Sequence, residues 1–273
     1  MRHYKREYGR YTILYKVFFP KLADKSFPLE VVKLKNGIKM ELDTTEYLQA
    51  LLYVFGDFEI STELALRKIV KQDDVVIDIG ANVGYLSLIL SKLTGPAGKV
   101  FAFEPEPNNF KAFIKNIDLN GFTNIIPSQS AISDIKGVLK LFLASGNNRG
   151  MHSTIFDEKT LSADFVETPS LPLDDFVQEN DLKKLDLVKI DVEGAELQVL
   201  KGMNKTLNTL RPKIIIELND DAQKANNYSN TQLIKYISET FNYKCYKISE
   251  DGALIDEITN ADNLNENAVC IPL

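Results

Sequence analysis

Apolar residues change their spacing between residues 75 and 93, and this change predicts a strand that leads into a helix. Val75 to Ile79 is a short run rich in β-branched residues, which is typical of a strand buried on both faces of a parallel sheet. The intervening residues, Gly80 to Gly84, supply the glycines of a sharp turn that a ligand can approach closely. After this turn, apolar residues recur at helical spacing: Val83, Leu86, Ile89, Leu90 and Leu93.

Patterns typical of strands and of helices continue to alternate along the chain, which predicts one Rossmann-like α/β domain with a mostly parallel sheet. Residues 166–173 contain Pro169 and Pro172, and we expect them to be a connecting segment. Further strands are expected at 99–104, 124–127, 138–143, 187–190, 213–218, 243–248 and 268–271, and helices at 61–70, 107–119, 174–178, 195–203 and 231–240.

The chain before residue 61 has a different pattern. Residues 31–42 alternate apolar and polar positions, which predicts a β-hairpin around a type I′ turn at Asn36-Gly37. We therefore divide the chain into an N-terminal accessory segment, residues 1–60, and the α/β domain, residues 61–273.

Charge is unevenly distributed. The whole chain has a formal net charge of −6. Residues 1–21 hold six basic residues and one acid, a net charge of +6 − 1 = +5, so the rest of the chain has a net charge of −6 − 5 = −11. An acidic body argues against nucleic acid as the main partner. Aromatic and basic residues alternate at helical spacing in residues 1–21. Two interpretations stay open for this segment: a helix on an anionic membrane surface, or a helix packed on the domain with its basic face in water.

Composition is that of a soluble protein, with 44% apolar and 26% charged residues. No apolar run is long enough to cross a bilayer, and the first residues lack the apolar stretch of a secretory leader. Cys245 and Cys270 are the two cysteines, and we expect them to be buried structural thiols in a reduced, cytoplasmic protein. Nothing in the sequence indicates the oligomeric state.

The turn after the first strand has the pattern Asp78-x-Gly80-x-Asn82-x-Gly84. This spacing departs from the G-x-G-x-x-G pattern of nicotinamide dinucleotide sites. A carboxylate two residues before the first glycine suits a ligand that carries an ammonium group. The next strand ends in Glu104, 24 residues after Gly80, where such folds hold the ribose hydroxyls of adenosine. Together these features indicate an adenosine-containing cofactor.

A second group of acids follows the strand at 187–190. Asp191 and Glu193 lie just past its end, where open α/β sheets bind ligands, and Glu196 follows them. Carboxylates this close repel one another unless a cation, a metal or a hydrogen-bond donor lies among them, although a solvated acidic turn is the alternative. Lys189 faces the same side of the strand as Asp191 and is expected to hold it ionised.

His152 is one of two histidines in the chain and follows a loop, residues 144–150, that is too polar for the core. If this loop overhangs the strand ends, the imidazole is placed to act as a general base, because it titrates near neutral pH. A packing or surface role is the alternative.

Four motifs occur in a characteristic order and spacing: Asp78-Ile-Gly-Ala-Asn-Val-Gly84, Phe103-Glu-Pro-Glu-Pro107, Lys189-Ile-Asp-Val-Glu-Gly-Ala-Glu196 and Arg211-Pro-Lys-Ile-Ile-Ile-Glu217. In these motifs the chain closely resembles the FkbM-type S-adenosylmethionine-dependent methyltransferases, over roughly residues 56–219. The resemblance implies a class I methyltransferase fold, which has a mostly parallel seven-stranded sheet, helices on both faces and a C-terminal antiparallel strand.

The resemblance also implies roles for individual residues. The turn after the first strand would cradle the methionine end of S-adenosylmethionine, the acid after the second strand would hold the ribose, and the loop after the third would touch the adenine. A further acid would lie near the cofactor's entrance, and the second acidic group would orient or deprotonate the acceptor, with the histidine as a competing base. Asp78, Gly80, Asn82 and Gly84 belong to that turn, Glu104 is the acid after the second strand, and Ser130 and Ala131 belong to the loop after the third strand. Glu59 is the acid near the entrance, Asp191 and Glu193 are the second acidic group, and His152 is the histidine.

The implied function is methyl transfer to a hydroxyl of a sugar, a glycolipid or lipid-linked glycan, or a polyketide-type acceptor. The acidic group is compatible with a carboxylate base and with a divalent metal that acidifies the hydroxyl. Two alternatives stay open. One is a catalytically silent protein that keeps the cofactor pocket, and the other is a nicotinamide-dependent oxidoreductase on a similar fold, which the missing G-x-G-x-x-G pattern disfavours.

Overall fold

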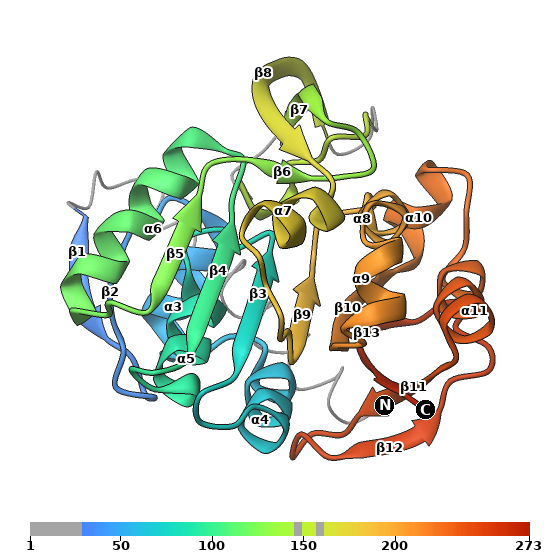
Figure 1. Cartoon of the computed structure of the whole chain (residues 1–273). Coiled ribbons are helices and arrows are strands. Elements are labelled where there is room, and N and C mark those ends of the chain that lie inside the picture. Colours follow the sequence, from blue (N-terminus) through green and yellow to red (C-terminus); the bar gives the residue numbers. More distant parts are fainter. Residues whose placement is uncertain (1–28, 145–148, 157–160) are drawn as a thin grey trace.

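The computed structural model describes residues 29–144, 149–156 and 161–273 (Figure 1). The basic aromatic segment, residues 1–21, lies outside the described residues, and so does most of the polar loop before His152. Among the helices that are described, none has the length and apolar character needed to cross a membrane.

Eight strands form the central sheet: β3 Val75–Ile79, β4 Lys99–Phe103, β5 Ile125–Ser128, β9 Leu187–Ile190, β10 Lys213–Asn219, β11 Tyr243–Ile248, β12 Leu254–Glu257 and β13 Asn265–Pro272. Their spatial order is β12-β11-β13-β10-β9-β3-β4-β5. Neighbours from β10 to β5 are parallel, while β13 runs antiparallel between β10 and β11. The predicted Rossmann-like sheet with a C-terminal antiparallel strand is therefore confirmed.

The sheet has one more strand than the seven that were predicted. The additional strand, β12, pairs with β11 at the edge of the sheet. Three of its four residues are exposed. Its sequence, Leu-Ile-Asp-Glu, does not alternate apolar and polar positions as a half-buried strand does, so the pattern did not predict it.

Helices cover both faces of the sheet (Figure 1). Successive strand residues point to opposite faces, so Val76 joins one hydrophobic cluster and Ile77 joins the other. The cluster around Val76 includes residues of α3 Tyr47–Phe55, α4 Ile60–Ile69, α5 Tyr85–Thr94 and α6 Pro107–Asn120. The cluster around Ile77 includes residues of α7 Leu173–Glu179, α8 Glu196–Gly202, α9 Asn204–Thr209 and α11 Asn230–Phe241, and the short helix α10 Asp220–Ala225 follows β10.

The order of the strands reverses next to β3. The chain passes from β3 outward through β4 to β5 and later returns to β9 on the other side of β3. Ile79, the last residue of β3, is therefore level with Phe103 of β4 and Ile190 of β9. Open α/β sheets bind ligands beyond the carboxyl ends of the strands at such a reversal.

The predicted N-terminal hairpin is present, with β1 Glu30–Lys33 and β2 Lys39–Leu42, but its turn differs from the prediction. A type I′ turn needs positive φ at both central residues, whereas Gly37 has a φ of +87° and Asn36 is not among the residues with positive φ. Met40 and Leu42 are fully buried in the same cluster as α5. The proposed boundary at residue 60 stays a prediction.

A three-stranded sheet lies between β5 and β9 in the sequence and is seen above the carboxyl ends of the central strands (Figure 1). Its strands are β6 Ala131–Ile132, β7 Gly137–Ala144 and β8 Leu161–Leu171. The prediction of a connecting segment at 166–173 is therefore wrong, because the 11-residue strand β8 includes Pro169, which is paired with Val138 of β7.

The two cysteines form a disulfide bond, which corrects the prediction of free thiols. Cys245 on β11 is directly opposite Cys270 on β13, and the Cys245–Cys270 bridge joins them. Both side chains are buried, as predicted. The sequence did not indicate the pairing, because the two residues are 25 positions apart and the register of the antiparallel strands brings them together.

Candidate functional site

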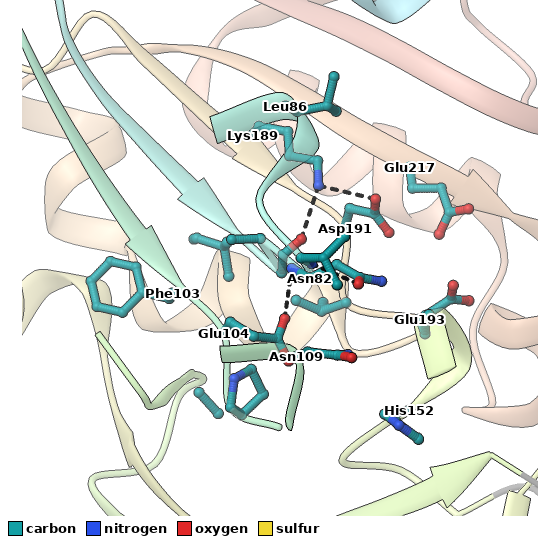
Figure 2. A pocket seen from close by; sticks show the side chains of 18 of the residues that line it. Asn82, Leu86, Phe103, Glu104, Asn109, His152, Lys189, Asp191, Glu193 and Glu217 are labelled. Atoms are coloured by element: carbon teal, nitrogen blue, oxygen red, sulfur yellow. Dashed lines mark hydrogen bonds and ion pairs between the residues drawn. The ribbon is translucent and has the colours of Figure 1, made fainter. Parts of the chain in front are cut away.

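A pocket of about 340 Å³ lies beyond the carboxyl ends of β3, β4, β9 and β10 (Figure 2). The three-stranded sheet of β6, β7 and β8, called the small sheet below, also lines this pocket, through Leu141 of β7 and Ala131 and Ile132 of β6. The N-terminal segment adds an apolar wall that sequence reasoning did not predict, formed by Tyr47, Leu48 and Phe58.

The turn after β3 brings Gly80 and Asn82 to the pocket wall. Both residues have positive φ, +82° for Gly80 and +52° for Asn82, and glycine and asparagine tolerate this conformation best. A Cβ on Gly80 would lie 1.8 Å from the backbone oxygen of Asp191. Gly80 thus allows the turn to pass close to the end of β9.

Gly84 belongs to the same motif but is not among the residues that line the pocket. Its φ is +92°, and a Cβ at this position would lie 2.1 Å from the ring of Phe113 on α6. The absence of a side chain at Gly84 therefore lets α5 and α6 pack together. The structure thus gives Gly84 a packing role, and the ligand contact expected for it stays a prediction.

Glu104 follows β4 and faces the pocket beside the glycine turn (Figure 2). The backbone N–H of Asn82 donates to its Oε2 over 2.7 Å, and the N–H of Glu106 donates to its Oε1 over 2.9 Å. Each carboxylate oxygen keeps a second lone pair for a ligand hydroxyl. Burial raises the pKa of Glu104 to about 7, although both hydrogen bonds oppose the shift.

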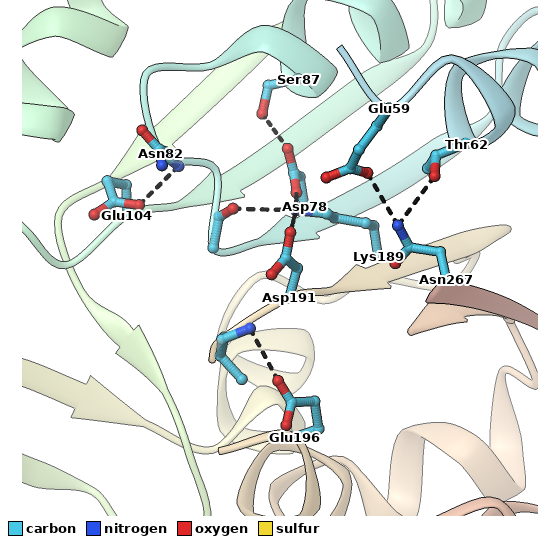
Figure 3. A network of polar contacts seen from close by, with 12 residues as sticks. Glu59, Thr62, Asp78, Asn82, Ser87, Glu104, Lys189, Asp191, Glu196 and Asn267 are labelled. Atoms are coloured by element: carbon cyan, nitrogen blue, oxygen red, sulfur yellow. Dashed lines mark hydrogen bonds and ion pairs between the residues drawn. The ribbon is translucent and has the colours of Figure 1, made fainter. Parts of the chain in front are cut away.

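Asp78 is not among the residues that line the pocket, and Figure 3 shows it within a network of polar contacts. Its side chain is fully buried, accepts a hydrogen bond from the hydroxyl of Ser87, and lies 3.4 Å from the ammonium of Lys189. Burial raises the pKa of Asp78 above its ordinary value. The cationic group that the sequence suggested for Asp78 is thus a side chain of the protein itself.

Lys189 connects three groups around the pocket floor. Its Nζ lies 3.0 Å from Asp191, 3.4 Å from Asp78 and 3.1 Å from the backbone oxygen of Gly80 (Figure 3). Burial alone would lower the pKa of Lys189, but Asp191 and Asp78 raise it above its ordinary value. The predicted pairing of Lys189 with Asp191 is confirmed.

Three carboxylates converge on the side of the pocket across from Glu104: Asp191 and Glu193 after β9, and Glu217 on β10 (Figure 2). One oxygen from each lies within 4.8 Å of the others. Burial, together with the neighbouring carboxylates, raises the pKa of Glu193 and of Glu217 well above the ordinary value. Sequence reasoning missed Glu217 as a site residue, although its place near the end of a predicted strand was a usable signal.

Glu196 is the third acid of its motif, but it stabilises the turn and stays out of the pocket. It accepts hydrogen bonds from the backbone N–H groups of Val192 and Gly194, over 3.2 and 3.1 Å, and from the hydroxyl of Tyr228 over 3.0 Å (Figure 3). These donors compensate its charge, so Glu196 needs no ligand.

The remaining predicted residues lie around the rim and walls. Glu59 has a φ of +45°, and the side-chain amide of Asn267 donates to its Oε2 over 3.0 Å. Ser130 lies 2.9 Å from the hydroxyl of Ser128, and it lines the pocket together with Ala131. The structure thus brings all the predicted site residues to one pocket except Asp78 and Gly84.

His152 also lines the pocket, and one of its ring nitrogens is used by the backbone. The N–H of Ala144 donates to its Nδ1 over 2.8 Å. This bond assigns the proton of the neutral ring to Nε2, which then acts as a hydrogen-bond donor. To act as a base through Nε2, His152 would first have to exchange tautomers.

Comparison with known proteins finds several relatives that are named as methyltransferases. The chain is 32% identical over 152 residues to the hexuronic acid methyltransferase AglP of Haloferax volcanii, covering 54% of this chain and 57% of that protein. It is 27% identical over 173 residues to the 31-O-demethyl-FK506 methyltransferase FkbM of Streptomyces tacrolimicus, covering 54% and 66%. The chain therefore spans less than two thirds of the length of these two relatives.

A solved structure, that of a methyltransferase FkbM from Methylobacillus flagellatus, is 16% identical with a TM-score of 0.49, and covers 95% of this chain and 60% of that one. The model of the methyltransferase FkbM domain matches residues 78–245, which is more than half of the chain and includes the glycine turn, Glu104 and the acidic group after β9. The chain belongs to the FkbM methyltransferase domain family.

Proposed function

We propose that this protein transfers a methyl group from S-adenosylmethionine to a hydroxyl oxygen of a polyhydroxylated acceptor. The observation that carries the proposal is the hydrogen bond from Asn82 to Glu104, in a pocket that continues to the carboxylates beyond β9 and β10. One end of the pocket thus offers a cofactor site, and the other offers groups that can bind and deprotonate a hydroxyl.

The cofactor end is formed by the turn after β3 and the ends of β4 and β5. Glu104 has lone pairs for the two ribose hydroxyls, and Ser130 and Ala131 form the wall for the adenine. Gly80 and Asn82 leave the backbone open for the methionine part. Asp78 acts on this end indirectly, because it holds Lys189 against the backbone oxygen of Gly80.

The acceptor end is formed by Asp191 and Glu193, with His152 on the side of the small sheet. In the reaction, the acceptor oxygen attacks the methyl carbon of the sulfonium in line with the carbon–sulfur bond. The new carbon–oxygen bond forms as the carbon–sulfur bond breaks, and the electron pair returns to sulfur to give S-adenosylhomocysteine. A carboxylate of Asp191 or Glu193 accepts the hydroxyl proton, and Nε2–H of His152 donates a hydrogen bond to a neighbouring acceptor oxygen.

The class of acceptor is inferred from the pocket and from the relatives. A sugar, a glycolipid or lipid-linked glycan, or a polyketide carries several hydroxyls, which suit a site lined by carboxylates and an imidazole. The relatives include a protein named for a hexuronic acid and another named for FK506. Both names fit polyhydroxylated acceptors and support this class.

Thermal shift tests the cofactor first. Saturation with S-adenosylhomocysteine at about a hundred times its dissociation constant contributes about 2.7 kcal/mol, or about 5 to 10 °C in Tm for a domain of this size. NAD, titrated in the same way, is expected to give no shift. A shift with NAD alone would contradict the proposal.

Methyl transfer from labelled S-adenosylmethionine to a panel of sugars, glycolipids and polyketides tests the activity. Asp191→Asn is expected to keep the thermal shift with S-adenosylhomocysteine and to lower turnover by about 100-fold or more. A protein that binds S-adenosylhomocysteine but methylates no member of the panel would support the catalytically silent alternative.

A further inference from the structure

Asp191, Glu193 and Glu217 form an oxygen-rich cluster, which we call the acidic cluster. Its residues come from two neighbouring parallel strands, Asp191 and Glu193 just beyond the end of β9 and Glu217 within the last part of β10. One oxygen of each carboxylate lies within 4.8 Å of the others, and all three residues line the pocket (Figure 2).

The donors around the acidic cluster are too few for its charge. Lys189 pairs with Asp191 at 3.0 Å, and the side-chain amide of Asn219 reaches Glu193 at 3.5 Å. Oε2 of Glu217 is buried, and no donor among the described residues forms a hydrogen bond with it. A buried carboxylate oxygen without a donor is costly, and the neighbouring carboxylates repel it further. The charge of this end of the pocket therefore favours the binding of a positively charged ligand.

We propose that Asp191, Glu193 and Glu217 bind a hard divalent cation such as Mg²⁺ or Mn²⁺. Carboxylate oxygens are the ligands these ions prefer, and among the described residues the cluster contains neither the cysteine nor the histidine ligands typical of zinc. Three protein oxygens leave coordination positions open, and the pocket gives access to them.

The role of this cation rests on the proposed function, whereas the binding of the metal does not. A divalent cation lowers the pKa of a hydroxyl that it coordinates and holds that oxygen in place. The acidic cluster lies at the acceptor end, across the pocket from Glu104 (Figure 2). The residues of the cluster would thus select acceptors with two adjacent oxygens that can coordinate one ion, such as a sugar diol or a hydroxy acid.

Titration of the full chain with Mn²⁺, followed by the loss of the electron paramagnetic resonance signal of the free ion, tests the site without any acceptor. The wild type is expected to bind one Mn²⁺ per chain, and Glu217→Gln is expected to weaken binding at least tenfold. Glu104→Gln is the matched control, because it removes a carboxylate of the same pocket outside the cluster. This variant is expected to keep Mn²⁺ and to weaken S-adenosylhomocysteine.

Three results would overturn the metal site: no Mn²⁺ bound by the wild type, equal binding by Glu217→Gln, or displacement of Mn²⁺ by S-adenosylhomocysteine. The last result would mean that the cluster binds the cofactor's ammonium group. A thermal shift of Glu217→Gln with S-adenosylhomocysteine shows that this variant is folded. If the wild type fails to bind S-adenosylhomocysteine yet binds Mn²⁺, the proposed function fails and the metal site stands.

Discussion

The backbone N–H of Asn82 donates a 2.7 Å hydrogen bond to Oε2 of Glu104, and this bond ties the turn after β3 to the end of β4. The acceptor is a buried carboxylate that also receives the N–H of Glu106. Two backbone donors therefore fix the orientation of a side chain that faces the pocket. Because burial raises its pKa to about 7, Glu104 changes its charge around neutral pH.

Binding of S-adenosylhomocysteine is expected to strengthen as the pH rises from 6 to 8. The pKa of Glu104 is about 7, above its ordinary value of 4.5, so the carboxyl is mostly neutral at pH 6 and mostly ionised at pH 8. The ionised form accepts stronger hydrogen bonds from ribose hydroxyls. The dissociation constant, measured by calorimetry, should fall by up to about tenfold over this range.

Glu104→Gln is the control for this pH dependence. Glutamine has the same shape but does not titrate, so the variant should bind more weakly at pH 8 and lose this part of the pH dependence. Other titrating groups in the pocket are present in both proteins and cancel in the comparison. Equal pH dependence in the two proteins would rule out Glu104 as its source.

Gly84→Ala is expected to destabilise the protein by about 2 to 4 kcal/mol in urea unfolding, because it adds overpacking to a positive φ. The φ of Gly84 is +92°, and its Cβ would lie 2.1 Å from the buried ring of Phe113. Gly121→Ala is the control, since Gly121 has a φ of +64° with no atom within 4 Å of its Cβ, and should cost only about 1 kcal/mol. Equal losses for the two variants would mean that Phe113 moves aside freely.

Local patterns predicted the parts of the fold that have local causes. The strand at Val75–Ile79 and the helices that follow glycine turns were recognised from spacing alone, and β9 has the predicted bounds. Strand β8 was missed because Pro169 lies within it and Pro172 follows directly after it, and β12 was missed because it is mostly exposed. The disulfide depends on the register of β11 and β13, which the sequence does not encode locally.

The site was predictable to a similar degree. Residues at strand ends, such as Glu104 and Asp191, were identified because the ends of parallel strands meet in space. Asp78 could not be placed correctly, because its partner Lys189 is on a strand more than 100 residues later. Glu217 was missed because its importance comes from its distance to Asp191 and Glu193 across two strands.

Reduction of the disulfide is expected to lower the free energy of unfolding by about 3 kcal/mol, because a closed loop of this length restricts the unfolded chain. Cys245 and Cys270 are 25 residues apart and fully buried in the folded protein. Urea unfolding with and without a reducing agent measures the difference on one and the same sequence. Alkylation of the denatured, unreduced protein should label neither cysteine, and labelling of both would show that the bridge is absent.

Lys189→Met is expected to destabilise the protein by about 3 to 5 kcal/mol, because it leaves the buried carboxylate of Asp78 and the partly buried carboxylate of Asp191 without their cation. Lys189 and Asp78 are 3% and 0% exposed, so solvent cannot replace the lost charge. Asp78→Asn in the same chain removes one of the two stranded acids while an oxygen remains for the hydroxyl of Ser87. The double variant should therefore be more stable than Lys189→Met alone, and urea unfolding of the wild type, both single variants and the double variant measures this coupling. If the two single losses simply add, Lys189 and Asp78 do not interact energetically, and the orientation of Lys189 must come from Asp191 and the backbone oxygen of Gly80.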